Sequence, residues 1–482
     1  MHTPSQSEPG DVAPDIAGDA GGPAESHECG ETIVAIATPP GRGGVGIVRL
    51  SGPRARAIAL PMLRLRSALD HARARFAEIL DPETQEKLDE ALVTCFTPPR
   101  SYTGEEVVEI AAHGSPVLLD LLVRRAIAAG ARLAAPGEFT ERAFLNGRVD
   151  LTQAEGVRDL IEAQTLYQAR VAAQQMGGSI SRSLRPIKRE LVDLIALLEA
   201  GIDFAEDDID TLPAAEILSR LERVRAPLQA IADSFKRGRL VQAGIGLAIV
   251  GRPNAGKSSL FNCLLQQERA IVTSAPGTTR DTVRERISIE GIPVELIDTA
   301  GLREAQDEAE RIGIQKSREA LADAEILLLV LDASQHVIPE ERDLLRELAG
   351  RKVLVAINKV DLPHARETET AAAMAEAMGR RAVRTSARTG EGLEELKREM
   401  LALVSGGAGE EGAMLTNLRH SLAVNAALES VAAGKNAAEQ EIPHEMLLLD
   451  LYAALRSLDS LTGETTADDV LNLIFSTFCI GK

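Results

Sequence analysis

The sequence predicts a multidomain protein of the α/β plus α class. In this arrangement a small N-terminal α/β domain precedes a discontinuous helical domain, into which a second α/β domain is inserted. Three observations predict it. The chain has 482 residues, too many for one hydrophobic core. Two segments with helical periodicity, 151–243 and 407–482, flank a segment, 244–406, in which strand and helix patterns alternate. Because neither helical segment has the features of a complete domain, we expect the two to pack together.

The composition is that of a soluble globular protein, with 45% hydrophobic and 26% charged residues. No apolar run approaches the ~20 residues that span a bilayer, so we expect a cytoplasmic protein without membrane contact. The net charge of −19 argues against a protein whose whole surface binds nucleic acid. The four cysteines are scattered without a CxxC pair, which favours neither a disulfide framework nor a zinc site.

Residues 1–30 form an acidic segment that contains six Asp or Glu, no Lys or Arg, and nine Gly or Pro. Such a segment cannot bury enough surface to offset its chain entropy, so we expect a disordered extension. It lacks the basic region of a signal peptide.

The N-terminal α/β domain is expected over 31–150. Its predicted strands are 32–37, 47–50, 90–96 and 105–111, and its predicted helix is 117–128. The glycine-rich loop 41–46 is similar to a dinucleotide-binding loop. However, no long helix follows it and no acidic residue stands at the required distance, so we interpret it as a tight turn.

The first helical segment has one apolar face. The apolar residues of this face recur with a period of 3.6 residues: Ile187, Leu191, Leu194, Ile195, Leu198 and Ile202. The inserted block instead alternates strands with helices. Strands are expected at 246–250, 286–289, 294–297, 326–331 and 353–357, and helices from Lys257, near 311–322 and from Leu393. This alternation predicts a mostly parallel sheet covered by helices.

The strand at 246–250 is followed by GRPNAGKS, residues 251–258, which matches the phosphate-binding GxxxxGKS pattern. The N–H groups of such a loop and the following helix N-terminus bind phosphate oxygens. Lys257 is expected to neutralise the β- and γ-phosphates, and the hydroxyl of Ser258 to bind Mg²⁺. The other expected nucleotide contacts in this stretch are Asn254, Ala255, Gly256 and Ser259.

Three further motifs follow in order and predict that the nucleotide is GTP. Asp298-Thr299-Ala300-Gly301 suits water-mediated Mg²⁺ binding and contact with the γ-phosphate. Asn358-Lys359-Val360-Asp361 places a carboxylate at Asp361 that can accept from guanine N1–H and N2–H₂, which adenine does not offer. Ser386-Ala387-Arg388 follows the sixth strand, where a backbone N–H can reach guanine O6.

Hydrolysis requires a group that orients water, and the residue after the DxxG glycine is Leu302, which cannot do so. Glu310 is a candidate catalytic residue; the alternative is a solvated carboxylate at a helix start. Thr279 is expected to supply a second hydroxyl to Mg²⁺. The amide oxygen of Asn254 and backbone carbonyls of 273–278 form a candidate site for a monovalent cation. Thr273 and Thr278 are also expected nucleotide contacts.

The chain resembles the family of tRNA modification GTPases called MnmE or TrmE. The loop motifs are shared with related GTPases, whereas three other stretches are more specific: TIVAIATPPGRGGVGIVRLSG at 32–52, PGEFTERAFLNGRVDLTQAE at 136–155, and FSTFCIGK at 475–482. The resemblance extends from about residue 31 to the last residue.

The resemblance implies a homodimeric GTPase, joined through its N-terminal domains, that works in a hetero-tetramer with the FAD protein MnmG. The pair would add a carboxymethylaminomethyl or aminomethyl group to C5 of wobble uridine 34 in certain tRNAs. The resemblance also implies a tetrahydrofolate derivative as one-carbon donor and K⁺ as the monovalent cation.

The resemblance assigns residues to these ligands. Arg49, Glu109, Arg148 and Lys482 fall on folate-contacting positions, although Lys is common in the family where this chain has Arg148, and the two differ in geometry. The K⁺ positions are Asn254, Thr273, Ala275 and Thr278. Cys479 matches a cysteine proposed to act in the modification chemistry; the alternative is an incidental thiol on a hydrophobic anchor.

Two other functions are compatible with a GTPase domain. A switch in ribosome assembly similar to Era or Der shares GRPNAGKS, but Der carries two such domains and Era ends in a KH domain, for which this sequence has no pattern after Gly406. A purely structural GTPase would need neither the terminal CIGK nor a folate-type N-terminus.

Overall fold

The computed structural model describes residues 30–81, 84–203, 212–268, 284–298, 324–348, 350–362, 368–405, 414–464 and 474–481. They belong to two compact units. The first comprises Met1–Ala135 together with Gly481, and the second Pro136–Ile480 together with Lys482. The first unit ends before Asp150, where the sequence pattern placed the domain boundary, because α3 (Glu138–Leu145) packs against α4 (Leu151–Glu162) of the second unit.

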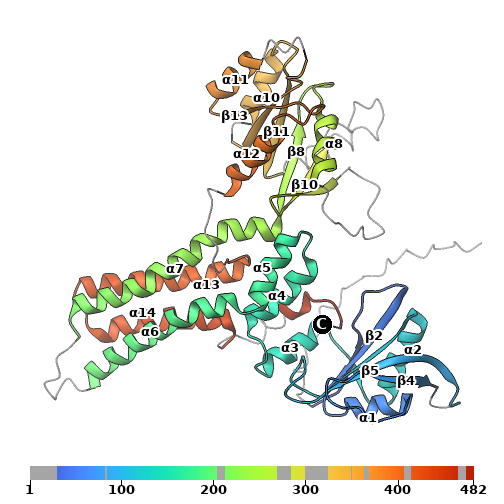
Figure 1. Ribbon diagram of the computed structural model, residues 1–482. Coiled ribbons are helices and arrows are strands. Elements are labelled where there is room, and N and C mark those ends of the chain that lie inside the picture. Colours follow the sequence, from blue (N-terminus) through green and yellow to red (C-terminus); the bar gives the residue numbers. More distant parts are fainter. Residues whose placement is uncertain are drawn as a thin grey trace, which may run out of the picture. The chain divides into compact units, whose positions relative to one another are not determined.

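The first unit is built on a seven-stranded sheet with the order β3-β4-β5-β6-β2-β1-β7 (Figure 1). Neighbouring strands are antiparallel, except that β1 and β7 are parallel. The strands are β1 (Ile33–Ile36), β2 (Gly43–Ser51), β3 (Leu63–Leu65), β4 (Arg75–Leu80), β5 (Lys87–Phe96), β6 (Val107–Gly114) and β7 (Arg132–Leu133).

Two helices, α1 (Ala55–Ala59) and α2 (Pro116–Ala128), share one hydrophobic core with this sheet. Alternate residues of β5 enter the core, namely Ala91, Val93 and Cys95, as the two-residue period of a strand requires. Pro116 begins α2, where the missing N–H of proline costs nothing.

The glycine-rich loop is not the tight turn that the sequence predicted, because Gly43–Gly46 belong to β2, with a register irregularity in their pairing to β6. A Cβ atom on Gly46 would lie 2.3 Å from Cδ1 of Leu119. The glycine therefore leaves room for the Leu119 side chain of helix α2 against the strand, and a larger residue would have to displace that side chain.

The two helical segments of the sequence pack into one bundle, as predicted. Its helices are α4, α5 (Leu166–Met176), α6 (Ser179–Asp203), α7 (Ala214–Ala243), α13 (Leu418–Glu439) and α14 (His444–Thr462). Helix α13 packs against α7 and α14, and α14 against α6 (Figure 1). The predicted apolar face of α6, from Ile187 to Leu198, is buried in their common core.

The inserted block forms a six-stranded sheet with the order β13-β12-β11-β8-β10-β9. All neighbours are parallel except β9 and β10, so the prediction of a mostly parallel sheet is confirmed. The strands are β8 (Ile245–Val250), β9 (Arg284–Ile289), β10 (Ile292–Asp298), β11 (Ile326–Asp332), β12 (Lys352–Asn358) and β13 (Arg381–Arg384).

Helices cover both faces of this sheet (Figure 1). One face packs against α8 (Lys257–Glu268) and α12 (Leu393–Ser405), and the other against α10 (Pro339–Glu347) and α11 (Thr368–Ala377). Because both faces are covered, β11 is an uninterrupted apolar run that is buried from Ile326 to Leu331. The helix expected near 311–322 lies outside the described residues.

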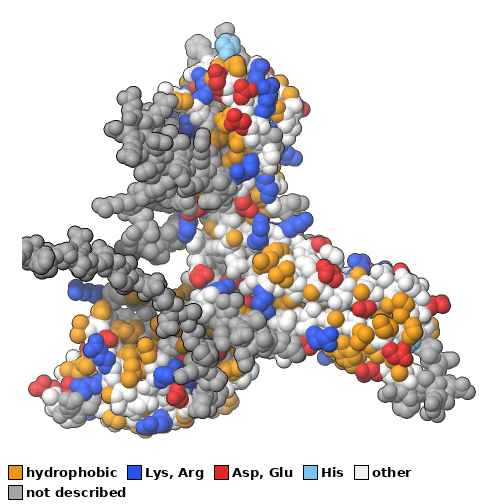
Figure 2. Space-filling model, turned by 180° about the vertical axis from the view of Figure 1, so that it is seen from behind, with side chains coloured by type: hydrophobic (Ala, Val, Ile, Leu, Met, Phe, Trp, Pro, Cys, Tyr) orange, Lys and Arg blue, Asp and Glu red, His pale blue; other side chains and the backbone are white. Residues whose placement is uncertain are grey.

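On the face of the molecule shown in Figure 2, acidic and basic side chains are interspersed, and hydrophobic side chains gather over the helical bundle. The exposed apolar residues of the bundle include Leu418, Leu422, Met446 and Leu449. None of the helices that the structure describes is both long enough and apolar enough to cross a membrane.

Candidate functional site

The phosphate-binding loop joins β8 to α8 and has a backbone that requires glycine at two positions. Gly251 and Gly256 have φ of +145° and +96°. A Cβ atom would lie 2.4 Å from the Val330 carbonyl oxygen at Gly251 and 2.2 Å from Asn358 Nδ2 at Gly256. Asn254 also adopts a left-handed conformation, with φ of +62°. Turns of this kind point successive N–H groups into one concavity, which binds anions.

The side chains of the loop differ in their contacts and exposure. The Nζ atom of Lys257 donates to the carbonyl oxygens of Gly251 and Arg252, at 2.8 and 2.7 Å, so its charge lies over the loop. Asn254, Ser258 and Ser259 are exposed, and Ala255 is buried. The hydroxyl of Ser258, in the first turn of α8, is therefore accessible to a metal ion.

Asn358, at the end of β12, connects the phosphate loop with the loop after β13. Its Nδ2 donates to the Ala255 carbonyl oxygen at 3.1 Å, and its Oδ1 accepts from the Ala387 N–H at 3.0 Å. The side chain is 1% exposed. Two motifs that are far apart in the sequence, 251–258 and 386–388, thus depend on one amide group.

Lys359 makes a second connection across the site. Its Nζ donates to the Asn254 carbonyl oxygen and to Asp332 Oδ2, both at 2.7 Å. Burial would raise the pKa of Asp332, but the bonds from Lys359 and Ser334 outweigh this effect and lower the pKa. Asp332 was not among the predicted residues; its position directly after the apolar run of β11 was the available signal.

The expected base-recognition residues also lie together. Ser386 is fully buried, and its Oγ donates to Asp361 Oδ1 at 2.6 Å. The same Oγ accepts from the Thr389 N–H, while Arg388 is exposed. The motifs at 251–258, 358–361 and 386–388 all follow the carboxyl ends of parallel strands, the usual ligand edge of such a sheet.

Several predicted site residues lie outside the described residues. They are Thr273, Ala275, Thr278, Thr279, Thr299, Ala300, Gly301, Leu302 and Glu310. Asp298 is described only by its backbone, which pairs with Ile249 of β8 beside the phosphate loop.

A second candidate site lies in the first unit, on facing residues of β2 and β6. Arg49 Nε donates to Glu109 Oε1 at 2.8 Å, and Arg49 Nη1 donates to the Gly481 carbonyl oxygen at 3.2 Å. The guanidinium carbon of Arg49 lies 5.5 Å from the centre of the Tyr102 ring, within cation–π distance. Tyr102 and Gly481 were not predicted, because only the tertiary structure brings them to Arg49.

The remaining predicted residues of this site are placed separately. Arg148 belongs to the second unit, where it is exposed after α3. Cys479 is exposed, and its carbonyl oxygen accepts from the Gly137 N–H at 3.5 Å. Lys482 lies outside the described residues.

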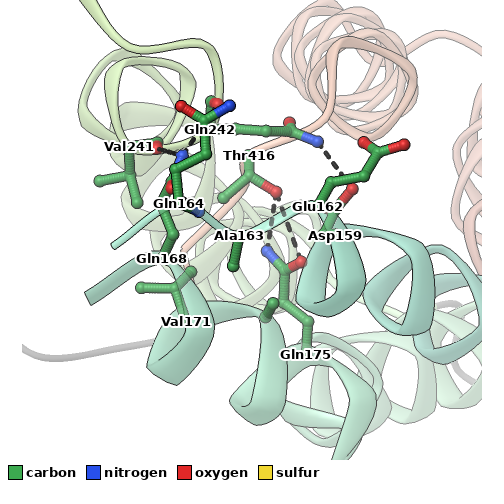
Figure 3. Close-up of a pocket in the computed structure, with 11 residues that line it drawn as sticks. Asp159, Glu162, Ala163, Gln164, Gln168, Val171, Gln175, Val241, Gln242 and Thr416 are labelled. Carbon is green, nitrogen blue, oxygen red and sulfur yellow. Dashed lines mark hydrogen bonds between the residues drawn. The ribbon is translucent and has the colours of Figure 1, made fainter. Parts of the chain in front are cut away.

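A pocket that no sequence motif indicated lies in the second unit, between α4, α5 and the end of α7 (Figure 3). Its volume is about 120 Å³. Burial raises the pKa of Asp159, which lines it, although Arg158 opposes this effect. The polar side chains of the lining are Asp159, Glu162, Gln164, Gln168, Gln175, Gln242 and Thr416.

Comparison with known proteins identified related chains. A family model described as the MnmE helical domain matches residues 151–479, and one described as the GTP-binding protein TrmE N-terminus matches 32–148. The tRNA modification GTPase MnmE of Koribacter versatilis is 57% identical over 457 residues, which cover 94% of this chain and 99% of that protein. The protein of the same name from Aquifex aeolicus is 42% identical, covering 94% and 100%.

Among solved structures, the G domain of the T. maritima FeoB iron transporter is 32% identical to the aligned part of this chain. The alignment covers 33% of this chain and 98% of that domain, with a TM-score of 0.26.

Proposed function

Because the chain belongs to the MnmE family of tRNA modification GTPases, we propose that it is a K⁺-dependent enzyme that modifies C5 of uridine 34 in certain tRNAs. It is a GTP hydrolase that acts in tRNA modification. The proposal adds the chemical group, carboxymethylaminomethyl or aminomethyl, and an MnmG-type FAD protein as partner. Mass spectrometry of uridine 34 in tRNA from a strain without this chain tests it: the modified base should be absent.

The observation that carries the cation dependence is the left-handed backbone of Asn254, beside an exposed side chain. A monovalent cation needs oxygen ligands without a competing fixed charge, and an amide oxygen satisfies both conditions. Thr273, Ala275 and Thr278 would complete the K⁺ site, and Ser258 and Thr279 would bind Mg²⁺. The bound K⁺ would supply positive charge to the transition state, and Glu310 would position water.

We expect GTP hydrolysis to be faster in KCl than in NaCl at equal ionic strength. Leu302 cannot orient water, so the enzyme depends on other groups, and the cation provides the charge that an arginine provides elsewhere. Initial rates of phosphate release measure this. Asn254→Lys should remove the dependence on the ion, because it places a fixed charge in the site. Equal rates in both salts would mean that Asn254 holds no cation.

We also propose that the first unit binds a tetrahydrofolate derivative in a homodimer. The ion pair of Arg49 and Glu109 offers what such a ligand needs: a cation for a carboxylate and a carboxylate that accepts from pterin N–H groups. Arg148 and Lys482 would add further cations. The short distance from Arg49 to the Gly481 carbonyl oxygen supports a role for the end of the chain in this site.

A further inference from the structure

The first turn of α5 contacts two separate segments: the turn between β9 and β10 of the nucleotide-binding sheet, and the end of α7, which leads into β8. Thr165, the N-cap of α5, donates from its Oγ1 to the Gly291 carbonyl oxygen at 2.5 Å. Gln168 donates from its Nε2 to the carbonyl oxygens of Val241 and Gln242, at 2.8 and 3.2 Å. Thr165 is 9% exposed, so its bond to Gly291 is shielded from water. The helical bundle thus contacts the sheet directly through Thr165, and Gln168 fixes the end of the helix that leads into β8.

The first contact holds one end of a stiff hairpin. Gly291 forms the turn between β9 and β10, which pair continuously from Ile289↔Ile292 to Arg284↔Ile297. At the other end, β10 finishes at Asp298, the first residue of the predicted Mg²⁺ and γ-phosphate motif. A strand of this length spans about 20 Å at ~3.3 Å per residue. The hairpin therefore reaches from α5 to the phosphate edge of the sheet.

The second contact is with the end of α7, just before the strand that leads into the phosphate loop. Val241 and Gln242 are among the last residues of α7, and β8 begins at Ile245 and runs into the phosphate loop. The two contacts are also fixed to each other. Thr165 Oγ1 accepts from the Gln168 N–H, and Gln168 Oε1 accepts from the Thr165 N–H, both at 3.1 Å. A displacement of the hairpin must therefore act on both side chains.

The hairpin turn at Gly291 is in tight contact with α5. The residue has φ of +84°, and a Cβ atom on it would lie 2.4 Å from Cβ of Tyr167, the residue between the two polar contacts. Tyr167 and Val171 of α5 pack into the hydrophobic core of the sheet, beside Ile289 and Ile292. Movement of the hairpin turn is consequently transmitted to the helix.

On its other side, the contact borders the polar pocket of Figure 3, which Gln168 and Gln242 both line. Gln242 Nε2 donates to Asp159 Oδ1 of α4 at 2.9 Å. Across the pocket, Gln175 Nε2 donates to Thr416 Oγ1, just before α13, at 2.9 Å. Because the pocket is open space, these polar groups can rearrange where a packed core would resist.

We propose that the first turn of α5 couples the nucleotide state of the sheet to the helical bundle, with Thr165 and Gln168 as positioning residues. The β9–β10 hairpin brings the change at the phosphates to Thr165, and Gln168 passes it to the end of α7 and to the lining of the pocket. The coupling goes beyond GTP hydrolysis, which requires neither residue at the reacting atoms. This coupling rests on the proposed function in one respect: the helical bundle must respond to the nucleotide state for tRNA modification.

The test compares Thr165→Val, which keeps the shape but can neither donate to Gly291 nor accept from the Gln168 N–H, with Thr165→Ser, which keeps the hydroxyl. Hydrogen exchange of the amides at 164–168 and 414–418 is measured in the full chain with GDP and with a non-hydrolysable GTP analogue. In the wild type, exchange should differ between the two nucleotides by about fivefold, the effect of one net hydrogen bond. Thr165→Val should abolish the difference, and Thr165→Ser should retain it.

Nucleotide affinity and steady-state kinetics separate coupling from folding. Thr165→Val should bind GDP, and should hydrolyse GTP with kcat and KM, within about twofold of the wild type, since the phosphate loop is intact and Thr165 does not contact the reacting atoms. If Thr165→Val unfolds, Gly291→Ala provides the same measurement, because it pushes the turn away from Tyr167. Two results would overturn the coupling: hydrogen exchange in the wild-type bundle that does not depend on the nucleotide, or a nucleotide-dependent difference that persists in both variants. Either result would leave the GTPase assignment intact.

Discussion

At the scale of single residues, the nucleotide site is held together by polar side chains that bond to the backbone of distant loops. Asn358 joins the phosphate loop to the loop after β13, and Lys359 joins the phosphate loop to Asp332. These residues come from the motif that also contains Asp361. The two motifs expected to bind base and phosphates therefore share one framework. Asp361 makes none of these four bonds, so a substitution there should leave the phosphate loop in place.

Asp361→Asn should move the preference of the enzyme from GTP toward xanthosine triphosphate. The carboxylate of Asp361 is oriented by Ser386 Oγ at 2.6 Å. We propose that it accepts from guanine N1–H and N2–H₂. The amide of asparagine offers a donor to the carbonyl oxygen that xanthine carries at C2. The ratio of kcat/KM for the two nucleotides should change by on the order of 10²-fold or more, as for other lost buried hydrogen bonds.

Ser386→Ala is the matched control for this substitution. It removes the bond that orients Asp361 but leaves the carboxylate, so it should weaken GTP binding without favouring xanthine. A variant Asp361→Asn that loses both nucleotides equally would contradict the assignment of Asp361 to the base.

The site residues that could be proposed from the sequence belong to linear motifs, in which a few consecutive positions fix the chemistry. Lys257, Asn358 and Asp361 are examples. Asp332 and Tyr102 were missed because each functions through a contact that arises only on folding, with Lys359 in one case and Arg49 in the other. The polar pocket was missed for the same reason, since its lining comes from segments more than 200 residues apart.

At the scale of elements, a buried charged cluster joins the two halves of the discontinuous bundle. Glu155 of α4 accepts from Arg419 Nε and Nη2 of α13, both at 2.9 Å, and it contacts His420 closely. Burial alone would raise the pKa of Glu155, but His420 and Arg419 outweigh it and lower the pKa to about 2. The carboxylate is therefore charged in the folded protein at any pH near neutrality.

This cluster predicts a specific loss of stability in acid. The unfolded pKa of a glutamate is 4.5 and the folded value about 2, so the contribution is fully present above pH 4.5 and is lost as the pH falls toward 2. The difference corresponds to about 3 kcal/mol of unfolding free energy. Urea unfolding at pH 7, 4.5 and 3 measures it. Glu155→Gln should be destabilised at pH 7 and should lose less stability than the wild type between pH 4.5 and 3.

Glu190→Gln serves as the control for the acid dependence. Glu190 pairs with Arg220 and Arg223, but its side chain is 25% exposed. Removing its charge should therefore lower the free energy of unfolding by less than about 1 kcal/mol. If both variants showed the acid dependence of the wild type, Glu155 would not be the group responsible.

Elements with a strong period were predicted well, and short or irregular ones were not. The apolar face of α6 and the buried run of β11 correspond closely to the sequence pattern. The short strand β3 and the helices α10 and α11 carry too few periodic residues to be recognised. Gly43–Gly46 was interpreted as a turn because glycine usually marks one; here it permits a close approach to Leu119.

At the scale of the whole molecule, the end of the chain is tied to distant segments. Within the second unit, Phe475 and Phe478 are buried in one cluster with Leu151 and Ala154, so this segment is anchored in an apolar core. Gly137 lies against the same segment, where a Cβ atom would be 2.5 Å from the Phe475 carbonyl oxygen. Gly481 belongs to the first unit, beside β1. The last residues are thus built into the fold.

Gly481→Ala should weaken binding of tetrahydrofolate while leaving GTP hydrolysis unchanged. Gly481 has φ of +98°, and a Cβ atom on it would lie 2.4 Å from the Ile36 carbonyl oxygen. Alanine must therefore displace the segment from β1 and remove its carbonyl oxygen from Arg49. The strain is worth about 1–3 kcal/mol, so affinity should fall by about 5- to 150-fold in a calorimetric titration.

Gly44→Ala is the matched control, because a Cβ atom there meets nothing within 4 Å. Removing residues 479–482 should reproduce the effect of Gly481→Ala on folate without changing kcat for GTP. The two measurements distinguish a ligand-binding tail from a structural one, since the nucleotide site of the second unit makes no use of Gly481. If Gly481→Ala left folate affinity unchanged, the end of the chain would not be part of the folate site. If folate binding and GTP hydrolysis were both lost, the end of the chain would be needed only for folding.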